Sequence, residues 1–74
     1  MEVVNRRQGW MFINRLKEFR EKAGLSQSEL ARRAGIAESN LSKIENGLWQ
    51  AWPKAKRQLA QVLKVRISEL FPEG

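Results

Sequence analysis

The sequence predicts a small all-α protein, a compact five-helix domain, and three features lead to this prediction. Apolar residues recur at intervals of three and four along most of the chain, which places them on one face of successive helices. Gly24, Gly35 and Gly47 interrupt this pattern, and each could end a helix in a left-handed turn. A length of 74 residues leaves room for one domain.

The N-terminal segment, residues 1–12, lacks a clear period. It is predicted to be either a loose arm or a short hairpin closed near Gly9, and Arg6 and Arg7 in it could reach around a polyanion or form a disordered basic tail. Residues 13–74 are predicted to form the folded domain.

The first helix is predicted to start near residue 13. One buried stripe follows the spacing i, i+4, i+7 and i+11, and it consists of Phe12, Leu16, Phe19 and Ala23. Asn14 or Asn5 could cap the start of this helix, and Gly24 ends it.

The second helix has the clearest start signal. Ser26 followed by Glu29 has the form of a capping box, in which each side chain accepts a backbone N–H of the other. The helix should reach about Ala34, with Leu30 facing inward, and Gly35 ends it.

The third helix is predicted from Ala37 or Glu38 to Asn46. Its inward residues are Leu41 and Ile44.

The fourth helix should begin at Pro53, because proline suits the first helical position and forces Trp52 before it to be extended. Its buried side comprises Leu59, Ala60, Val62 and Leu63. A short fifth helix is expected at 67–71, ended by Pro72.

Composition excludes several classes of function. The chain has neither Cys nor His, so disulfides, thiolate metal sites and the commonest general base are absent, and no metal, cofactor or enzymatic activity is expected. No apolar run approaches the roughly 20 residues that span a membrane, and a cytoplasmic location is the simplest interpretation. Fourteen basic residues against eight acidic ones give a net charge of +6, which favours polyanionic partners.

Two segments carry the most specific pattern, LSQSELARRAGI at 25–36 and LSKIENG at 41–47. Ala31 is small where the second and third helices would cross, and Gly35 lets the chain reverse between them, as in a helix-turn-helix. With these segments, the chain resembles the Cro/C1-type helix-turn-helix family of phage repressors and xenobiotic-response-element-like regulators over residues 14–71. The resemblance implies a lambda-repressor-like fold and binding to double-stranded DNA.

The helical periodicity and the resemblance both indicate the same outer face of the third helix. This face consists of Glu38, Ser39, Ser42, Lys43 and Asn46. Lys43 could reach guanine O6 and N7, and Ser39 is adaptable. Glu38 could accept a hydrogen bond from cytosine N4, or it could only stabilise the helix by placing a negative charge near the positive end of its dipole.

Other positions have supporting roles. The resemblance implies that Gln27 anchors a DNA phosphate and braces the first residue of the third helix, and that Arg20 and Glu45 form a structural ion pair. Arg32 and Lys54 are candidate phosphate contacts among the other cations.

The sequence also departs from the family pattern. Ala37 replaces the usual Ser or Thr cap of the third helix, Lys64 stands where Gly usually ends the fourth, and Lys56 replaces an apolar residue. Trp49 and Trp52 either fold back against the fourth helix or form an exposed aromatic contact for a dimer partner, a protein partner or the DNA backbone.

The leading hypothesis is a sequence-specific transcriptional regulator, a repressor that binds an inverted repeat as a homodimer. The alternative is a protein-interaction module or antitoxin of the same fold that uses Trp49 and Trp52.

Overall fold

The computed structural model describes residues 12–72, and these residues form an all-helical domain without strands. The helices within this range are α2 (Leu16–Lys22), α3 (Gln27–Ala34), α4 (Glu38–Glu45), α5 (Pro53–Leu63) and α6 (Ile67–Leu70). The five-helix architecture predicted from the sequence is confirmed. The expected arm or hairpin lies outside the described residues, apart from Phe12.

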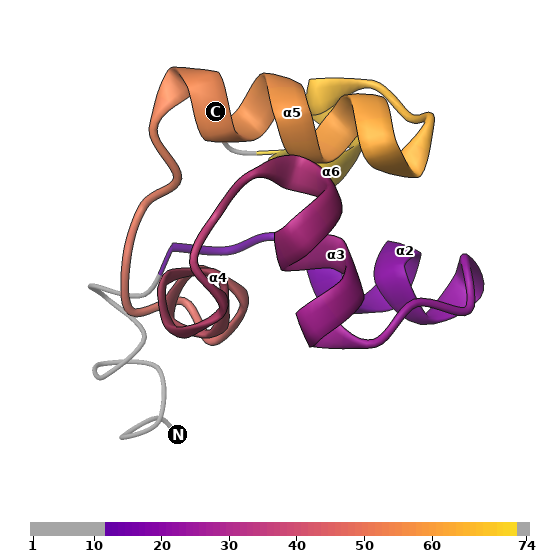
Figure 1. The fold of residues 1–74 in the computed structure, drawn as a ribbon. Helices are drawn as coiled ribbons and strands as arrows, with labels where there is room; N and C mark the ends of the chain where they lie inside the picture. Colours follow the sequence, from indigo (N-terminus) through magenta and orange to yellow (C-terminus); the bar gives the residue numbers. More distant parts are fainter. Residues whose placement is uncertain (1–11, 73–74) are drawn as a thin grey trace, which may run out of the picture.

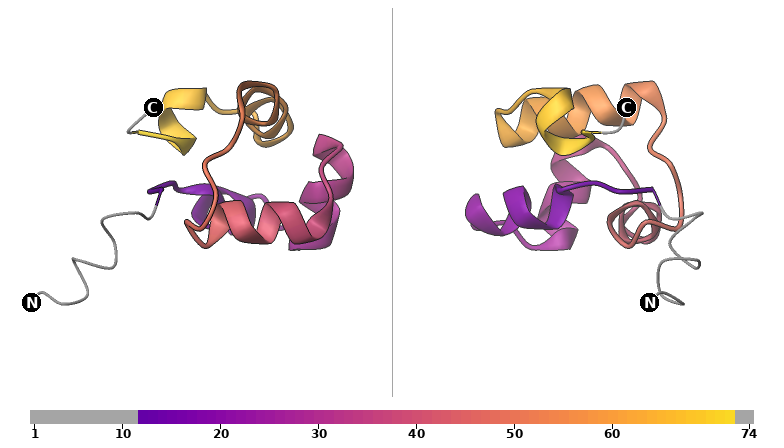
Figure 2. Two further views of the ribbon diagram at one scale, coloured as in Figure 1. Left: turned by 90° about the vertical axis from the view of Figure 1, so that its left-hand side faces the viewer. Right: turned by 180° about the vertical axis from the view of Figure 1, so that it is seen from behind.

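The helices form two levels joined by α3. α3 packs against both α4 and α5, and α5 packs against α6. Figure 1 shows α4 and α2 on one side of the molecule and α5 with α6 on the other, and Figure 2 shows the same separation from two further directions. α4 therefore lies at an outer edge of the domain.

The core is made almost entirely of aliphatic side chains. The six largest fully buried side chains come from every helix of the described range: Leu16, Leu30, Leu41, Ile44, Leu59 and Leu70. Each such burial contributes about 1.5–3 kcal/mol to folding. Ala31 and Ala34 are also buried on α3, where small residues allow the neighbouring helices to approach closely.

The helix ends follow the sequence signals closely. Ser26 and Glu29 form both hydrogen bonds of the capping box, each 3.0 Å long. Gly35 ends α3 with a φ of 71°, and Lys64 ends α5 with a φ of 59° although it is not glycine. A left-handed lysine at this position is mildly strained, as expected from the missing glycine.

The start of α2 differs from the prediction. Helix α2 begins at Leu16 rather than near residue 13, and Phe12 and Ala23 are exposed instead of continuing the buried stripe. The cause is tertiary: the N–H of Phe12 donates to the Gly47 carbonyl at 2.9 Å, and the N–H of Arg15 donates to the Leu70 carbonyl at 2.8 Å. These bonds use backbone donors for long-range contacts and fix a non-helical segment before α2.

No helix within residues 12–72 is both long and apolar enough to span a lipid bilayer.

Candidate nucleic-acid interface

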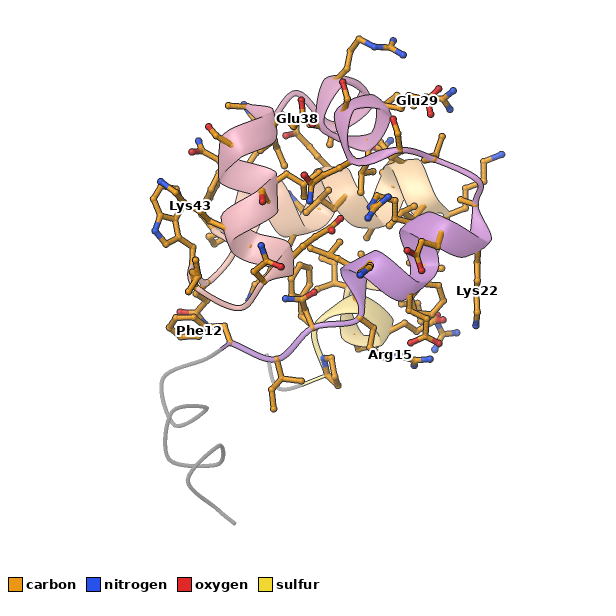
Figure 3. All side chains as sticks on the ribbon, turned by 90° about the horizontal axis from the view of Figure 1, so that it is seen from below. Phe12, Arg15, Lys22, Glu29, Glu38 and Lys43 are labelled. Carbon is orange, nitrogen blue, oxygen red and sulfur yellow. The ribbon has the colours of Figure 1, made fainter. Side chains whose placement is uncertain are left out.

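Helix α4 has two chemically opposite faces. Leu41 and Ile44 are fully buried against the rest of the domain. The outward residues predicted from the sequence are all polar: Glu38, Ser39, Lys43 and Asn46 are exposed, and Ser42 is half-buried. Figure 3 shows Lys43 projecting from the side of α4 that faces away from the other helices. Hence α4 presents a continuous surface of hydrogen-bonding groups to solvent.

The first turn of α4 lacks a side-chain cap. Ala37 adopts the extended conformation of an N-cap residue, with φ −61° and ψ 138°, but it has no side-chain acceptor. Glu38 lies in this first turn and is exposed, so its carboxylate is close to the positive end of the helix dipole.

The last turn of α4 is tied to α2 through an ion pair. The Arg20 guanidinium donates to both Glu45 carboxylate oxygens, from Nε at 2.7 Å and from Nη2 at 3.3 Å. Its Nη1 donates to the Leu25 carbonyl at 2.9 Å. The two side chains are only 12% and 3% exposed, and the hydrogen bond to Glu45 raises the pKa of Arg20. Two parallel bonds in a partly buried setting fix the angle of α4 more firmly than an exposed pair would.

Gln27 joins the same cluster from α3. Its Nε2 donates to Glu45 Oε1 at 3.1 Å. The resemblance implied that Gln27 braces the first residue of the third helix, Glu38, but in the structure its bond goes to the opposite end of α4. Gln27 bonds to this end because the Glu45 carboxylate can accept a further hydrogen bond after those from Arg20. One Nε2 hydrogen of Gln27 remains for another acceptor.

Asn14 is a positioning residue that the sequence analysis missed in part. The N-cap of α2 is Arg15, which forms no side-chain cap, so Asn14 is not the expected cap; its Oδ1 accepts the N–H of Leu16, the first residue of the helix, at 3.0 Å. Its Nδ2 also donates to the Ile44 carbonyl at 2.8 Å and so holds the end of α4. The residue type suggested a role at the start of the helix. The bond to Ile44 spans thirty positions, and nothing in the sequence around Asn14 predicts it.

A left-handed turn at Gly47 ends α4. The Gly47 N–H donates to the Ile44 carbonyl at 3.0 Å and the Leu48 N–H donates to the Lys43 carbonyl at 2.9 Å, which together form a Schellman motif. The φ of Gly47 is 79°, a conformation that favours glycine. The chain then returns past Lys43, and the Lys43 ammonium lies 4.6 Å from the centroid of the Trp49 ring.

The remaining predicted contacts lie on other helices. Arg32 is exposed in the last turn of α3, and Lys54 is exposed in the first turn of α5. Lys56, which replaces an apolar residue of the family pattern, is half-buried with its ammonium 5.5 Å from the Phe71 ring centroid. Trp49 and Trp52 are 41% and 39% exposed, so neither is fully folded into the core.

A separate charged cluster lies on α2, on the side of the molecule away from Lys43 (Figure 3). Glu18 accepts from Arg15 at 2.8 Å and pairs with Lys22 at 3.3 Å. These two partners, Arg15 first, lower the pKa of Glu18 to about 2. Because all three side chains are well exposed, this cluster stabilises the surface of α2 and does not contribute to the α4 face.

Within the described range, no three His, Cys, Asp or Glu side chains are grouped so that they could hold a metal ion.

Comparison with known families agrees with this geometry. The helix-turn-helix family pattern matches residues 16–70, from the first residue of α2 to the last of α6. The chain belongs to the Cro/C1-type helix-turn-helix family. Its sequence is 40% identical over 65 residues to the transcriptional regulator SinR of Bacillus subtilis, covering 85% of this chain and 58% of SinR. It is 33% identical over 57 residues to a helix-turn-helix regulator of Archaeoglobus fulgidus, covering 77% of this chain and 81% of the relative.

Solved structures of the family superpose well on the domain. SinR in complex with SinI has a TM-score of 0.74 at 38% identity, covering 80% of this chain and 58% of SinR. The restriction-modification controller protein C.AhdI of Aeromonas hydrophila has a TM-score of 0.73 at 35% identity, covering 77% of this chain and 86% of C.AhdI. SinR has also been solved with DNA, with a TM-score of 0.69 at 39% identity, covering 72% of this chain and 86% of the SinR chain. The helix-turn-helix domain is thus shared with transcriptional regulators.

Proposed function

We propose that this protein is a sequence-specific DNA-binding transcriptional regulator that places α4 in the major groove. The proposal rests on one observation: α4 has a polar outer face, and its inner face and last turn are fixed to the rest of the domain. Its inner residues Leu41 and Ile44 are fully buried, and Glu45 is bonded to both Arg20 and Gln27. A groove-reading helix needs both properties, because base-edge contacts depend on orientation. SinR, which has the same fold, has been solved with DNA.

The outward residues of α4 suit base edges of different kinds. Lys43 donates to guanine O6 or N7, Ser39 donates or accepts, and Glu38 accepts from cytosine N4 when it faces a base. Ser42 and Asn46 complete the surface. A well-formed bidentate pair discriminates against the wrong base by about 1–3 kcal/mol.

Residues beside α4 would hold the DNA backbone. The free Nε2 hydrogen of Gln27 can donate to a phosphate while the other stays on Glu45. Arg32 and Lys54 are exposed cations on the neighbouring helices and are proposed as further phosphate contacts. The net charge of +6 attracts the duplex before these contacts form.

We further propose that the protein acts as a homodimer on an inverted repeat, as a repressor. An eight-residue helix contacts only a few base pairs, so one copy specifies too short a site. Two copies related by a two-fold axis read half-sites about 34 Å apart and double the information. Occupying DNA is by itself enough for repression, because it excludes other proteins from the same site.

Selection of bound sequences from random duplex DNA tests this proposal. We expect an enriched inverted repeat and an affinity for it that falls steeply with salt, by about 0.9 log unit per log[salt] for each phosphate neutralised. Recovery of no sequence preference at any salt concentration would contradict DNA reading.

The exposed apolar residues after α4 favour a second candidate, a protein-interaction module. Leu48, Trp49 and Trp52 are 62%, 41% and 39% exposed. SinR has been solved in complex with a protein, SinI. Association through these residues would bury apolar area and would depend little on salt, so the salt dependence distinguishes the two candidates.

A further inference from the structure

We propose that Trp49 is a positioning residue for Lys43, holding its ammonium so that the side chain enters the groove in one direction. This inference rests on the proposed function, because it assigns a specificity-determining role next to the α4 face. It concerns an exposed aromatic residue just beyond the end of α4.

The backbone of the turn after α4 places Trp49 next to Lys43. The Schellman turn at Gly47 folds the chain back, so that the N–H groups of Leu48 and Trp49 both point to the Lys43 carbonyl, at 2.9 and 3.3 Å. The carbonyl of Gly47 in turn accepts the Phe12 N–H at 2.9 Å, which fixes the turn from the other side. Trp49 therefore has a defined position relative to the helix residue whose side chain it contacts.

The side chains complete the contact. The ammonium of Lys43 lies 4.6 Å from the ring centroid of Trp49, inside the range of about 6 Å in which the ring quadrupole attracts a cation. Among the described residues, no carboxylate forms a salt bridge with Lys43. The ring is thus the group that orients this ammonium, and the exposure of Trp49 leaves the pair accessible to a ligand.

Orientation of a lysine affects discrimination more than affinity. A free lysine has four flexible torsions and can place its charge on a phosphate or on several base edges, all with similar Coulomb gain. A lysine held by a ring meets acceptors in one direction, so only duplexes with guanine at the matching base pair gain the contact. A cation–π contact at an exposed site corresponds to about a two- to fivefold preference for the held arrangement.

The test uses the full chain and a panel of duplexes that carry every base pair at each position of a selected site. Lys43→Ala first identifies the base pair at which Lys43 discriminates. We expect Trp49→Ala to lower discrimination at that base pair by about two- to fivefold, and Trp49→Phe to restore most of it because phenylalanine keeps a π face. Ile67→Ala, which truncates a similarly exposed apolar side chain on α6, should leave discrimination unchanged. Combining Trp49→Ala with Lys43→Ala should give no further loss at that base pair.

A second measurement does not involve DNA. In the free protein, the methylene protons next to the Lys43 ammonium should show an upfield NMR shift from the Trp49 ring, absent in Trp49→Ala and present in the Ile67→Ala control. Circular dichroism of each variant establishes that it is folded.

The inference is overturned if Trp49→Ala weakens all duplexes equally, if it increases discrimination, or if the NMR shift is absent from the unsubstituted protein. If the NMR shift is present but Lys43→Ala changes preference on no duplex, the proposed base reading by Lys43 fails, and the role of Trp49 in specificity falls with it. Loss of discrimination without the NMR shift would assign Trp49 a different role and would leave the proposed function intact.

Discussion

Glu45 is the residue through which three helices meet. It belongs to α4, accepts two hydrogen bonds from Arg20 on α2 and one from Gln27 on α3, and is only 3% exposed as a side chain. A carboxylate can satisfy all three bonds because each oxygen has two lone pairs. The orientation of α4 therefore depends strongly on this one side chain.

Replacing Glu45 by glutamine should destabilise the protein markedly. Glu45→Gln keeps the size of the side chain but removes the charge, which leaves the Arg20 guanidinium largely buried without a counterion, at a cost of about 2–3 kcal/mol. Urea unfolding followed by circular dichroism measures this loss. The matched control is Glu18→Gln, which breaks the exposed ion pairs of α2 and should have a much smaller effect. Equal losses in the two variants would contradict the assigned role of Glu45.

The long-range contacts that hold α4 were predictable only where the family resemblance named both partners. The resemblance implied the pairing of Arg20 with Glu45, and the structure places these side chains in contact. It did not reveal that Gln27 bonds to Glu45 or that Asn14 reaches the Ile44 carbonyl. Both bonds join residues far apart in sequence, and their geometry depends on how the helices pack.

At the scale of elements, the two ends of α4 differ in how well their backbone groups are hydrogen-bonded. Ala37 provides no cap, whereas the turn at Gly47 satisfies carbonyls of the last turn through two backbone bonds. The first turn is consequently the part of α4 that a capping side chain could stabilise.

Introducing a cap at the start of α4 should stabilise the protein. Ala37 already has the extended backbone of an N-cap, so in Ala37→Ser the hydroxyl can accept the N–H of Asn40, for a gain of about 1 kcal/mol in the free energy of unfolding. Ser26→Ala removes the existing cap of α3 and should lose a similar amount. Denaturant unfolding of both variants provides the measurement, and a destabilised or unchanged Ala37→Ser protein would show that the first turn is already satisfied.

Local signals predicted most helix boundaries but not the start of α2. Ser26, Gly35 and Pro53 act through their own backbone geometry, and the structure has a helix boundary at each. Lys64, which stands where the family usually has a helix-ending glycine, has a φ of 59°. Phe12 fitted the apolar period of the first helix but lies outside it, because its N–H bonds to Gly47 across the molecule.

At the scale of the whole molecule, the other helices hold α4 at one edge of the domain. α5 and α6 lie on the side opposite α4 (Figures 1 and 2), and α3 connects the two levels. The sequence predicted this helix-turn-helix arrangement, since small residues and glycine turns leave few ways to pack five short helices. It did not decide whether Trp49 and Trp52 are buried, because that depends on the space left by neighbouring helices.

The most direct test of the account compares two residues that are proposed to contact DNA in different ways. Binding of the unsubstituted protein, Lys43→Ala and Gln27→Ala is measured on a selected site and on all its single-base-pair variants, at one salt concentration. We expect Lys43→Ala to lose about fivefold or more of the discrimination at one base pair of each half-site, because a base contact is removed. Gln27→Ala should weaken all duplexes by a similar factor, because a phosphate contact carries no base information. If Lys43→Ala instead lowered every affinity equally and preserved base preference, α4 would not be the element that reads the sequence.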